Sequence, residues 1–163
     1  MLATAIVAFR EVIEAALIVA IVLGASRGII GRGRWVSAGI LLGVTGAALV
    51  AVFAGVINDS FSGNGQAFLN AGILLAAVGM LAWHNIWMSS HGRSLAAEVK
   101  EVGSAVQSGS RPLTALMIIT LVAVMREGSE VVLFLWAFAT GGMSGMSMLA
   151  GGFVGLEIGR AHV

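Results

Sequence analysis

Four runs of predominantly apolar residues constrain the fold of this chain most strongly, because an α-helix needs about 20 such residues to cross a hydrocarbon layer of about 30 Å. The runs cover residues 2–24, 35–57, 66–88 and 113–139, and a shorter fifth run covers 146–158. Hydrophobic residues make up 58% of the 163 residues and charged residues only 10%, whereas soluble domains carry about 25% charge. The sequence therefore predicts an all-α, polytopic transmembrane helix bundle with four full spans and a short or partial fifth.

The connections between the runs differ in their basic residues, and this difference predicts an orientation. The basic residues of the first connection are Arg27, Arg32 and Arg34, and those of the third are Arg93, Lys100 and Arg111. The second and fourth connections hold neither lysine nor arginine. Because cytoplasmic loops carry an excess of Lys and Arg, we expect a multi-pass protein of the cell (inner) membrane with its N-terminus outside.

Two R-E-x-x-E quintets interrupt the apolar runs, residues 10–14 in the first run and 126–130 in the fourth. Each charge at the centre of a membrane helix costs roughly 2.5 to 3.5 kcal/mol, so six such charges indicate a function. No basic residue precedes the first run, so we expect residues 2–24 to be a retained membrane helix rather than a signal peptide. A helical rise of 1.5 Å per residue places Glu11 about 14 Å and Glu127 about 18 Å from the outer ends of their helices.

The quintets also mark a repeat. The segment after Glu14 aligns with the segment after Glu130, so the first and fourth helices are counterparts separated by a three-helix unit. An odd number of spans reverses the direction of the copy, which is the inverted-repeat plan of many secondary transporters. We expect one transmembrane domain over 1–163, made of a first repeat at 1–91, a cytoplasmic amphipathic linker helix at 92–111 that begins at Ser94, and an incomplete second repeat at 112–163.

Four carboxylates without any cysteine favour a hard cation, because oxygen donors suit such ions and thiolates select softer ones. We expect Glu11, Glu14, Glu127 and Glu130 to contact the ion. Arg10 lies four residues before Glu14, and Arg126 four residues before Glu130, so each arginine can pair with a glutamate when no ion is bound. For a single quintet, an ion pair that only stabilises helix packing is an equally good explanation; two copies at equivalent inverted positions favour a site.

The two quintets resemble the R-E-G-L-E motifs of the microbial high-affinity iron permease family. Residues 87–93 (WMSSHGR) are similar to the W-M-x-x-H-x-R stretch of that family, and the amphipathic segment after them is similar too. The resemblance implies an iron permease, with ferric iron favoured as the transported ion and no permanent cofactor. It also implies an extracytoplasmic oxidase or iron-delivery protein as a partner. The chain differs from the family pattern in having Val12 where glycine is usual, and in having about five spans instead of seven, which suggests a truncated form.

Four further polar residues are secondary candidates for ion contact. His84 lies inside the third run, where a packing role is the main alternative to a ligand role. His91 is expected to anchor the cytoplasmic interface or to contact the leaving ion, and Asp59 to cap the outer loop or to attract incoming ions. Glu157, in the fifth run, can pair locally with Arg160.

Other functions fit parts of the pattern. An intramembrane enzyme is disfavoured because the sequence has no H-E-x-x-H motif and no suitable Ser-His pair. A transporter of protons or of another cation remains open, as does a non-transporting membrane subunit. A net charge of +1, without a basic stripe, excludes a nucleic-acid partner. The expected partners are membrane lipid and either a second copy of the chain or another chain that supplies missing helices.

Overall fold

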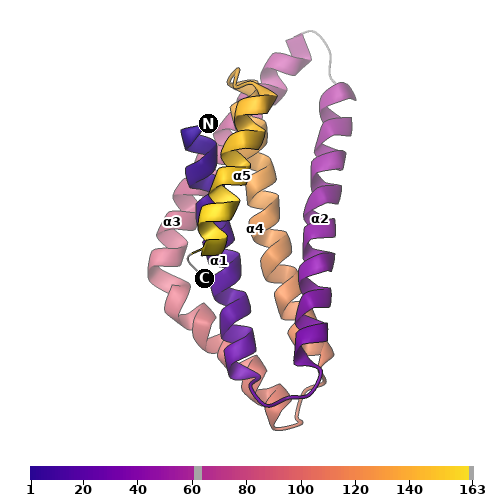
Figure 1. Cartoon of the computed structure of the whole chain (residues 1–163). Coiled ribbons are helices and arrows are strands. Elements are labelled where there is room, and N and C mark those ends of the chain that lie inside the picture. Colours follow the sequence, from indigo (N-terminus) through magenta and orange to yellow (C-terminus); the bar gives the residue numbers. More distant parts are fainter. Residues whose placement is uncertain (61–63, 162–163) are drawn as a thin grey trace.

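The computed structural model is a bundle of long helices (Figure 1). It describes the backbone of residues 1–60 and 64–161. It also describes their side chains, except those of residues 58, 59, 64, 85, 87–93, 95 and 160. Within this described part every regular element is an α-helix: α1 (Leu2–Ala25), α2 (Arg32–Ser60), α3 (Asn64–Gln107), α4 (Thr114–Thr140) and α5 (Gly145–Ala161). The predicted all-α fold is confirmed.

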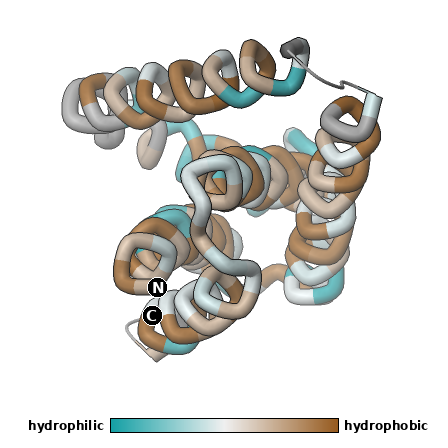
Figure 2. Tube along the Cα trace, turned by 90° about the horizontal axis from the view of Figure 1, so that it is seen from above, coloured by the Kyte–Doolittle hydropathy of each residue, from teal (hydrophilic) through white to brown (hydrophobic). Residues whose placement is uncertain are grey.

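The helices have the length and the surface of membrane spans. Arg32–Ile57 in α2 and Gly65–His84 in α3 are long and apolar enough to cross a membrane. α1 and α4 have 24 and 27 residues, but each carries the three charges of a quintet near its middle. Large hydrophobic residues are exposed on each of the five helices, and hydrophobic residues recur along all of them (Figure 2). This distribution is that of an integral membrane protein, since lipid takes the place of water around such helices.

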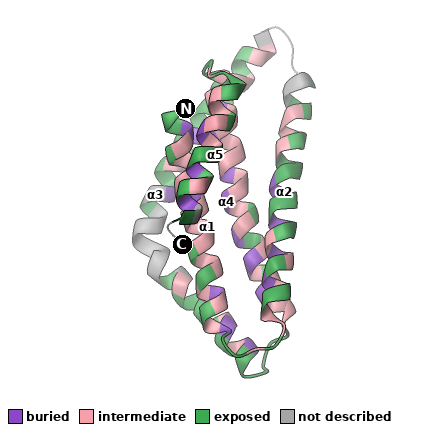
Figure 3. Cartoon of the chain, in the orientation of Figure 1, coloured by how far each residue is buried: buried purple, intermediate pink, exposed green. Residues whose placement is uncertain are grey.

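Successive helices run in alternating directions, so α1 and α4 are antiparallel (Figure 1). Buried residues recur along one face of α4 at spacings of four and three, and both glutamates of its quintet belong to this series. Its members are Leu116, Thr120, Ala123, Glu127, Glu130, Phe134 and Ala137. On α1 the series Thr4, Ala8 and Glu11 follows the same spacing. Figure 3 shows that buried positions recur along α4, whereas much of α2 is exposed. The spacing therefore turns the charged residues inward.

Glycines let two pairs of helices pack closely. A Cβ at Gly43 of α2 would lie 2.8 Å from the Cβ of Val124 in α4, and one at Gly155 of α5 would lie 2.9 Å from the Cβ of Ala8 in α1. Small residues are typical of such contacts between membrane helices. The second helix of each predicted half thus packs on the first helix of the other half, a reciprocal pairing that agrees with an inverted repeat.

The helix α3 differs from the prediction. We expected a span that ends near Met88 and a separate linker helix that begins at Ser94, but α3 is continuous over 44 residues, from Asn64 to Gln107. The prediction of a separate helix at 92–111 was wrong because a fall in hydropathy does not end a helix. Helices end where the backbone is interrupted, and here that interruption comes at Gly109, with φ of +79°, and Pro112.

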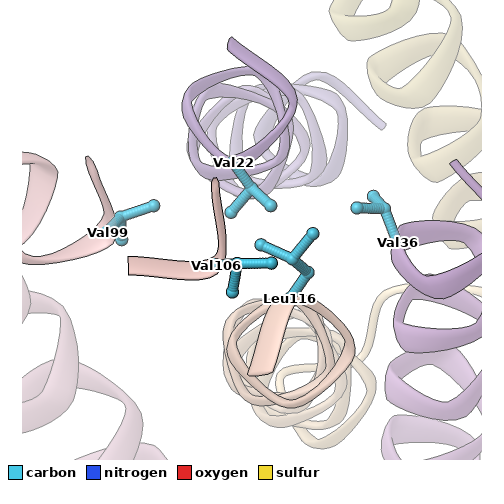
Figure 4. Packing of buried hydrophobic residues seen from close by; sticks show 5 residues of the cluster. All are labelled: Val22, Val36, Val99, Val106 and Leu116. Atoms are coloured by element: carbon cyan, nitrogen blue, oxygen red, sulfur yellow. The ribbon is translucent and has the colours of Figure 1, made fainter. Parts of the chain in front are cut away.

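The C-terminal end of α3 packs in a cluster of aliphatic side chains from four helices. Figure 4 shows Val22 of α1, Val36 of α2, Val99 and Val106 of α3, and Leu116 of α4 pointing toward one another. All five are buried. This cluster lies at the end of the bundle where α1 meets α2 and α3 meets α4, so it fixes the distance between the two quintet helices.

Candidate metal centre

The two quintets meet at the centre of the bundle. Glu11 of α1 and Glu127 and Glu130 of α4 have exposed fractions of only 1%, 4% and 5%. Each residue lies near the middle of its helix, since Glu11 is tenth in α1 and Glu127 fourteenth in α4. The sequence predicted that these carboxylates would lie at similar depth on antiparallel helices, and the structure places them there.

His84 of α3 joins the two quintets. Its Nε2 lies 2.7 Å from Oε2 of Glu14, and its Nδ1 lies 2.9 Å from Oε2 and 3.2 Å from Oε1 of Glu130. The ring is 2% exposed. A single imidazole therefore contacts one glutamate of each quintet and brings a third helix into the centre.

The arginines pair within their own quintets, as the i to i+4 spacing predicted. The Nε of Arg10 donates a hydrogen bond of 2.9 Å to Glu14 Oε1, whereas the Nε of Arg126 donates a longer one of 3.4 Å to Glu130 Oε1. Arg126 also has its Nη2 3.5 Å from Nδ1 of His84. Its side chain is 39% exposed, against 25% for Arg10. The two quintets are thus similar in sequence but unequal in the strength of their ion pairs.

Several carboxylate oxygens of the centre have no hydrogen-bond partner among the described residues. They are both oxygens of Glu11 and Oε2 of Glu127, and all are buried. A buried charged group without a partner costs at least about 1 to 3 kcal/mol, so this arrangement needs a compensating charge. Four carboxylates face two guanidinium groups here, which leaves a formal charge of 4 − 2 = 2 negative units if all four carboxylates are ionised and His84 is neutral.

The geometry suits a cation. One ligand atom each from Glu11, His84, Glu127 and Glu130 lies within 4.8 Å of the others, and all four residues are buried. Buried charges in membrane segments are tolerated when they pair with one another or mark an ion pathway. Carboxylates and an imidazole are both donors that iron accepts.

A groove reaches two of these carboxylates from the side of the bundle. It has a volume of about 410 Å³ and is lined by residues of α1, α2, α4 and α5, with Glu11 and Glu127 among them. A second groove, of about 680 Å³, runs between α2, α3 and α4 and reaches Arg126 and Glu130. The centre is therefore approached by two grooves that both border α2 and α4 but have no lining residue in common.

The difference between the quintets at Val12 has a structural explanation. In the second quintet, a Cβ at Gly128 would lie 2.7 Å from the Cβ of Ala47 in α2. The equivalent position of the first quintet is Val12, and the glycine is instead on the partner helix: a Cβ at Gly159 of α5 would lie 2.8 Å from Cγ1 of Val12. The glycine belongs to the quintet helix α4 in one pair and to the partner helix α5 in the other. Both pairs of helices can therefore approach closely.

The secondary candidates have different outcomes. His84 lies in the centre. It was only a secondary candidate for ion contact because a histidine inside an apolar run can equally be a packing residue, and its contacts with both quintets depend on which helices are neighbours. In the structure it is residue 21 of the 44 in α3, so it lies near the middle of that helix. Glu157 is half-buried on α5 and is not part of the four-residue group. The side chains of Asp59 and His91 lie outside the described residues.

The comparisons with known proteins agree on one family. The model of the iron permease FTR1 family matches residues 1–161. The chain is similar to the ferrous iron permease EfeU of Escherichia coli O6:K15:H31, with 31% identity over 136 residues, and to that of Yersinia pestis, with 32% identity over 137 residues. These matches cover 81% of this chain but 49% and 48% of the relatives, so the chain spans about half the length of the curated relatives it matches. No solved structure matches it.

Proposed function

Because the chain belongs to the iron permease FTR1 family, we propose that it takes part in iron uptake across a cell membrane, with the ion passing through the buried centre formed by the two quintets. The observation that carries this proposal is Glu11, which is 1% exposed and has no hydrogen-bond partner for either oxygen among the described residues. Such a group is stabilised when a cation binds and is costly when none does. The relatives are named as permeases, which favours transport over the intramembrane enzyme.

We propose iron in the ferrous state as the ion that the centre holds. The family resemblance favoured ferric iron, but the imidazole of His84 lies among the carboxylates and can join the donor set. Imidazole nitrogen suits Fe²⁺ better than it suits a hard trivalent ion. The relatives carry the name ferrous iron permease, which supports the same choice. Uptake of iron kept reduced with ascorbate should therefore exceed uptake of ferric citrate, and the opposite order would restore the ferric assignment.

We further propose the orientation that the basic connections indicate, with the N-terminus outside and the α1–α2 and α3–α4 connections in the cytoplasm. Ions then approach the centre from the end of the bundle that carries the N-terminus. The α4–α5 connection lies at this end (Figure 1). We also propose that a partner for iron delivery or oxidation docks on this side.

Removal of the central carboxylates tests the transport proposal. Glu11→Ala and Glu127→Ala should each reduce radioactive iron uptake by cells to the level of cells without the protein, because each removes an oxygen donor from the centre. The exposed Glu98 of α3 supplies a matched control, and Glu98→Ala should leave uptake unchanged. Amounts of each variant in the membrane are measured in parallel. Unchanged uptake in both central variants would contradict the proposal.

A further inference from the structure

Glu14 differs from the other three carboxylates of the centre. Both of its oxygens are already bonded: Oε1 accepts from Nε of Arg10 at 2.9 Å, and Oε2 lies 2.7 Å from Nε2 of His84. The contact with His84 is the shortest polar contact described in the centre, and contacts of this length between charged groups are the strong ones. Glu14 is also the glutamate of the centre that is not fully buried, with its side chain 18% exposed.

The other three carboxylates lie close together. Glu11, Glu127 and Glu130 are the glutamates whose ligand atoms lie within 4.8 Å of one another and of His84. Two of the three, Glu11 and Glu127, also have oxygens without a hydrogen-bond partner among the described residues. Both features leave Glu14 out.

The two nitrogens of His84 face these two classes of carboxylate. Nε2 faces Glu14, and Nδ1 faces Glu130. A metal-bound histidine almost always uses its second nitrogen to donate to a carboxylate or carbonyl, and this outer contact fixes the ring orientation. Glu14, which faces Nε2 of His84, has the position of such an outer carboxylate.

The geometry points to an asymmetric iron site in which Glu11, Glu127, Glu130 and Nδ1 of His84 are the ligands, while Glu14 is a positioning residue that holds the imidazole through Nε2. This inference rests on the proposed function and deepens it. The two quintets then have unequal roles, although their sequences are alike. The second quintet supplies two ligands and the first supplies one ligand and one orienting carboxylate.

The arginines fit this division. Arg126 has its Nη2 3.5 Å from Nδ1 of His84 and its Nε 3.4 Å from Glu130, so its guanidinium lies beside two of the assigned ligands. Its long bonds and 39% exposure allow it to move away when an ion arrives. Arg10 is bonded to Glu14 at 2.9 Å and can stay in place, because Glu14 keeps its contact with His84 when the ion is bound.

X-ray absorption spectroscopy of Fe²⁺ bound to the purified protein under anaerobic conditions tests the inference. The wild-type spectrum should contain the multiple-scattering signal of an imidazole ligand, and His84→Gln should lose that signal. Glu14→Gln should keep the imidazole signal and weaken Fe²⁺ binding by roughly 10- to 100-fold, the usual effect of an outer partner. Glu127→Gln should weaken binding more than Glu14→Gln does, and Glu98→Gln should leave it unchanged.

The outcomes separate this inference from the function on which it rests. Wild-type protein that binds Fe²⁺ without an imidazole signal would overturn the ligand assignment and leave iron transport standing. Equal loss of binding in Glu14→Gln and Glu127→Gln would overturn the division of roles. Wild-type protein that binds no Fe²⁺ would overturn the proposed function itself. The wild-type spectrum alone decides the role of His84 if His84→Gln does not fold.

Discussion

His84 contacts one glutamate from each quintet, and this contact makes α3 part of the centre instead of a peripheral support. Both ring nitrogens lie within 3 Å of a carboxylate oxygen and the ring is buried. A side chain held at both nitrogens has little rotational freedom, so its position is determined by α1 and α4 together. Any relative movement of these two helices changes at least one of its bonds.

The unequal ion pairs of the quintets predict unequal effects of removing the two arginines. Arg10→Gln should lower the free energy of unfolding by about 1 to 3 kcal/mol, because it removes a short charge-assisted bond from Glu14. Arg126→Gln should cost less than about 1 kcal/mol, since its pair is longer and more exposed. Unfolding in detergent, followed by circular dichroism, measures both. Arg34→Gln is a control at an exposed arginine, and a larger loss for Arg126→Gln than for Arg10→Gln would contradict the prediction.

Among single residues, the ion pairs of the quintets could be predicted from sequence, whereas His84 could be predicted only as a secondary candidate for ion contact. The i to i+4 spacing fixes which glutamate each arginine reaches, whatever the rest of the chain does, and both pairs are present. The role of His84 depends on the length and path of α3, which are tertiary properties. The exchange of glycine between Gly128 and Gly159 likewise depends on which helices are neighbours.

The helices themselves agree with the apolar runs at nearly every end. Predicted spans at 2–24, 35–57 and 113–139 correspond to α1, α2 and α4, and the short fifth run corresponds to the 17-residue α5. The exception is the C-terminal end of α3. There the sequence becomes polar after residue 88, but it contains no proline before Pro112 and includes good helix formers at 95–98 and 100–101.

The glycine contacts between helices predict a sharp difference between two neighbouring positions of α5. A Cβ at Gly155 would meet the backbone of α1 at Ala5, with the Cβ of Ala8 at 2.9 Å, whereas a Cβ at Gly152 meets nothing within 4 Å. Gly155→Ala should therefore destabilise the protein by about 1 to 3 kcal/mol, the usual cost of overpacking. Gly152→Ala should be neutral or stabilising by up to about 1 kcal/mol, because alanine favours the helix.

Thermal unfolding of the two glycine variants in the same detergent measures this difference, and the matched substitution removes any general effect of alanine. Equal melting temperatures for Gly155→Ala and Gly152→Ala would show that α5 does not pack on α1 through this face. A loss of stability in Gly152→Ala alone would show that the opposite face of α5 is the packed one.

The orientation of the whole molecule can be read with single cysteines, since the sequence contains none. Ser144 in the α4–α5 connection and Ser108 after α3 are both exposed and lie at opposite ends of the bundle. With the N-terminus outside, Ser144→Cys should react with a membrane-impermeant maleimide in right-side-out vesicles. Ser108→Cys should react only after the vesicles are opened. The reverse pattern would place the N-terminus in the cytoplasm.

The reciprocal pairing of the helices has a consequence for the order in which the molecule is assembled during synthesis. α2 packs on α4 and α5 packs on α1. The contact between Gly43 and Val124 can therefore form only after about 80 further residues have been synthesised. At about 5 to 20 residues per second this delay is about 4 to 16 s. Until then α1 and α2 lie in lipid without α5 and α4, the helices on which they pack. The four glutamates of the centre therefore come together only late in synthesis, when α4 is available to pack against α1.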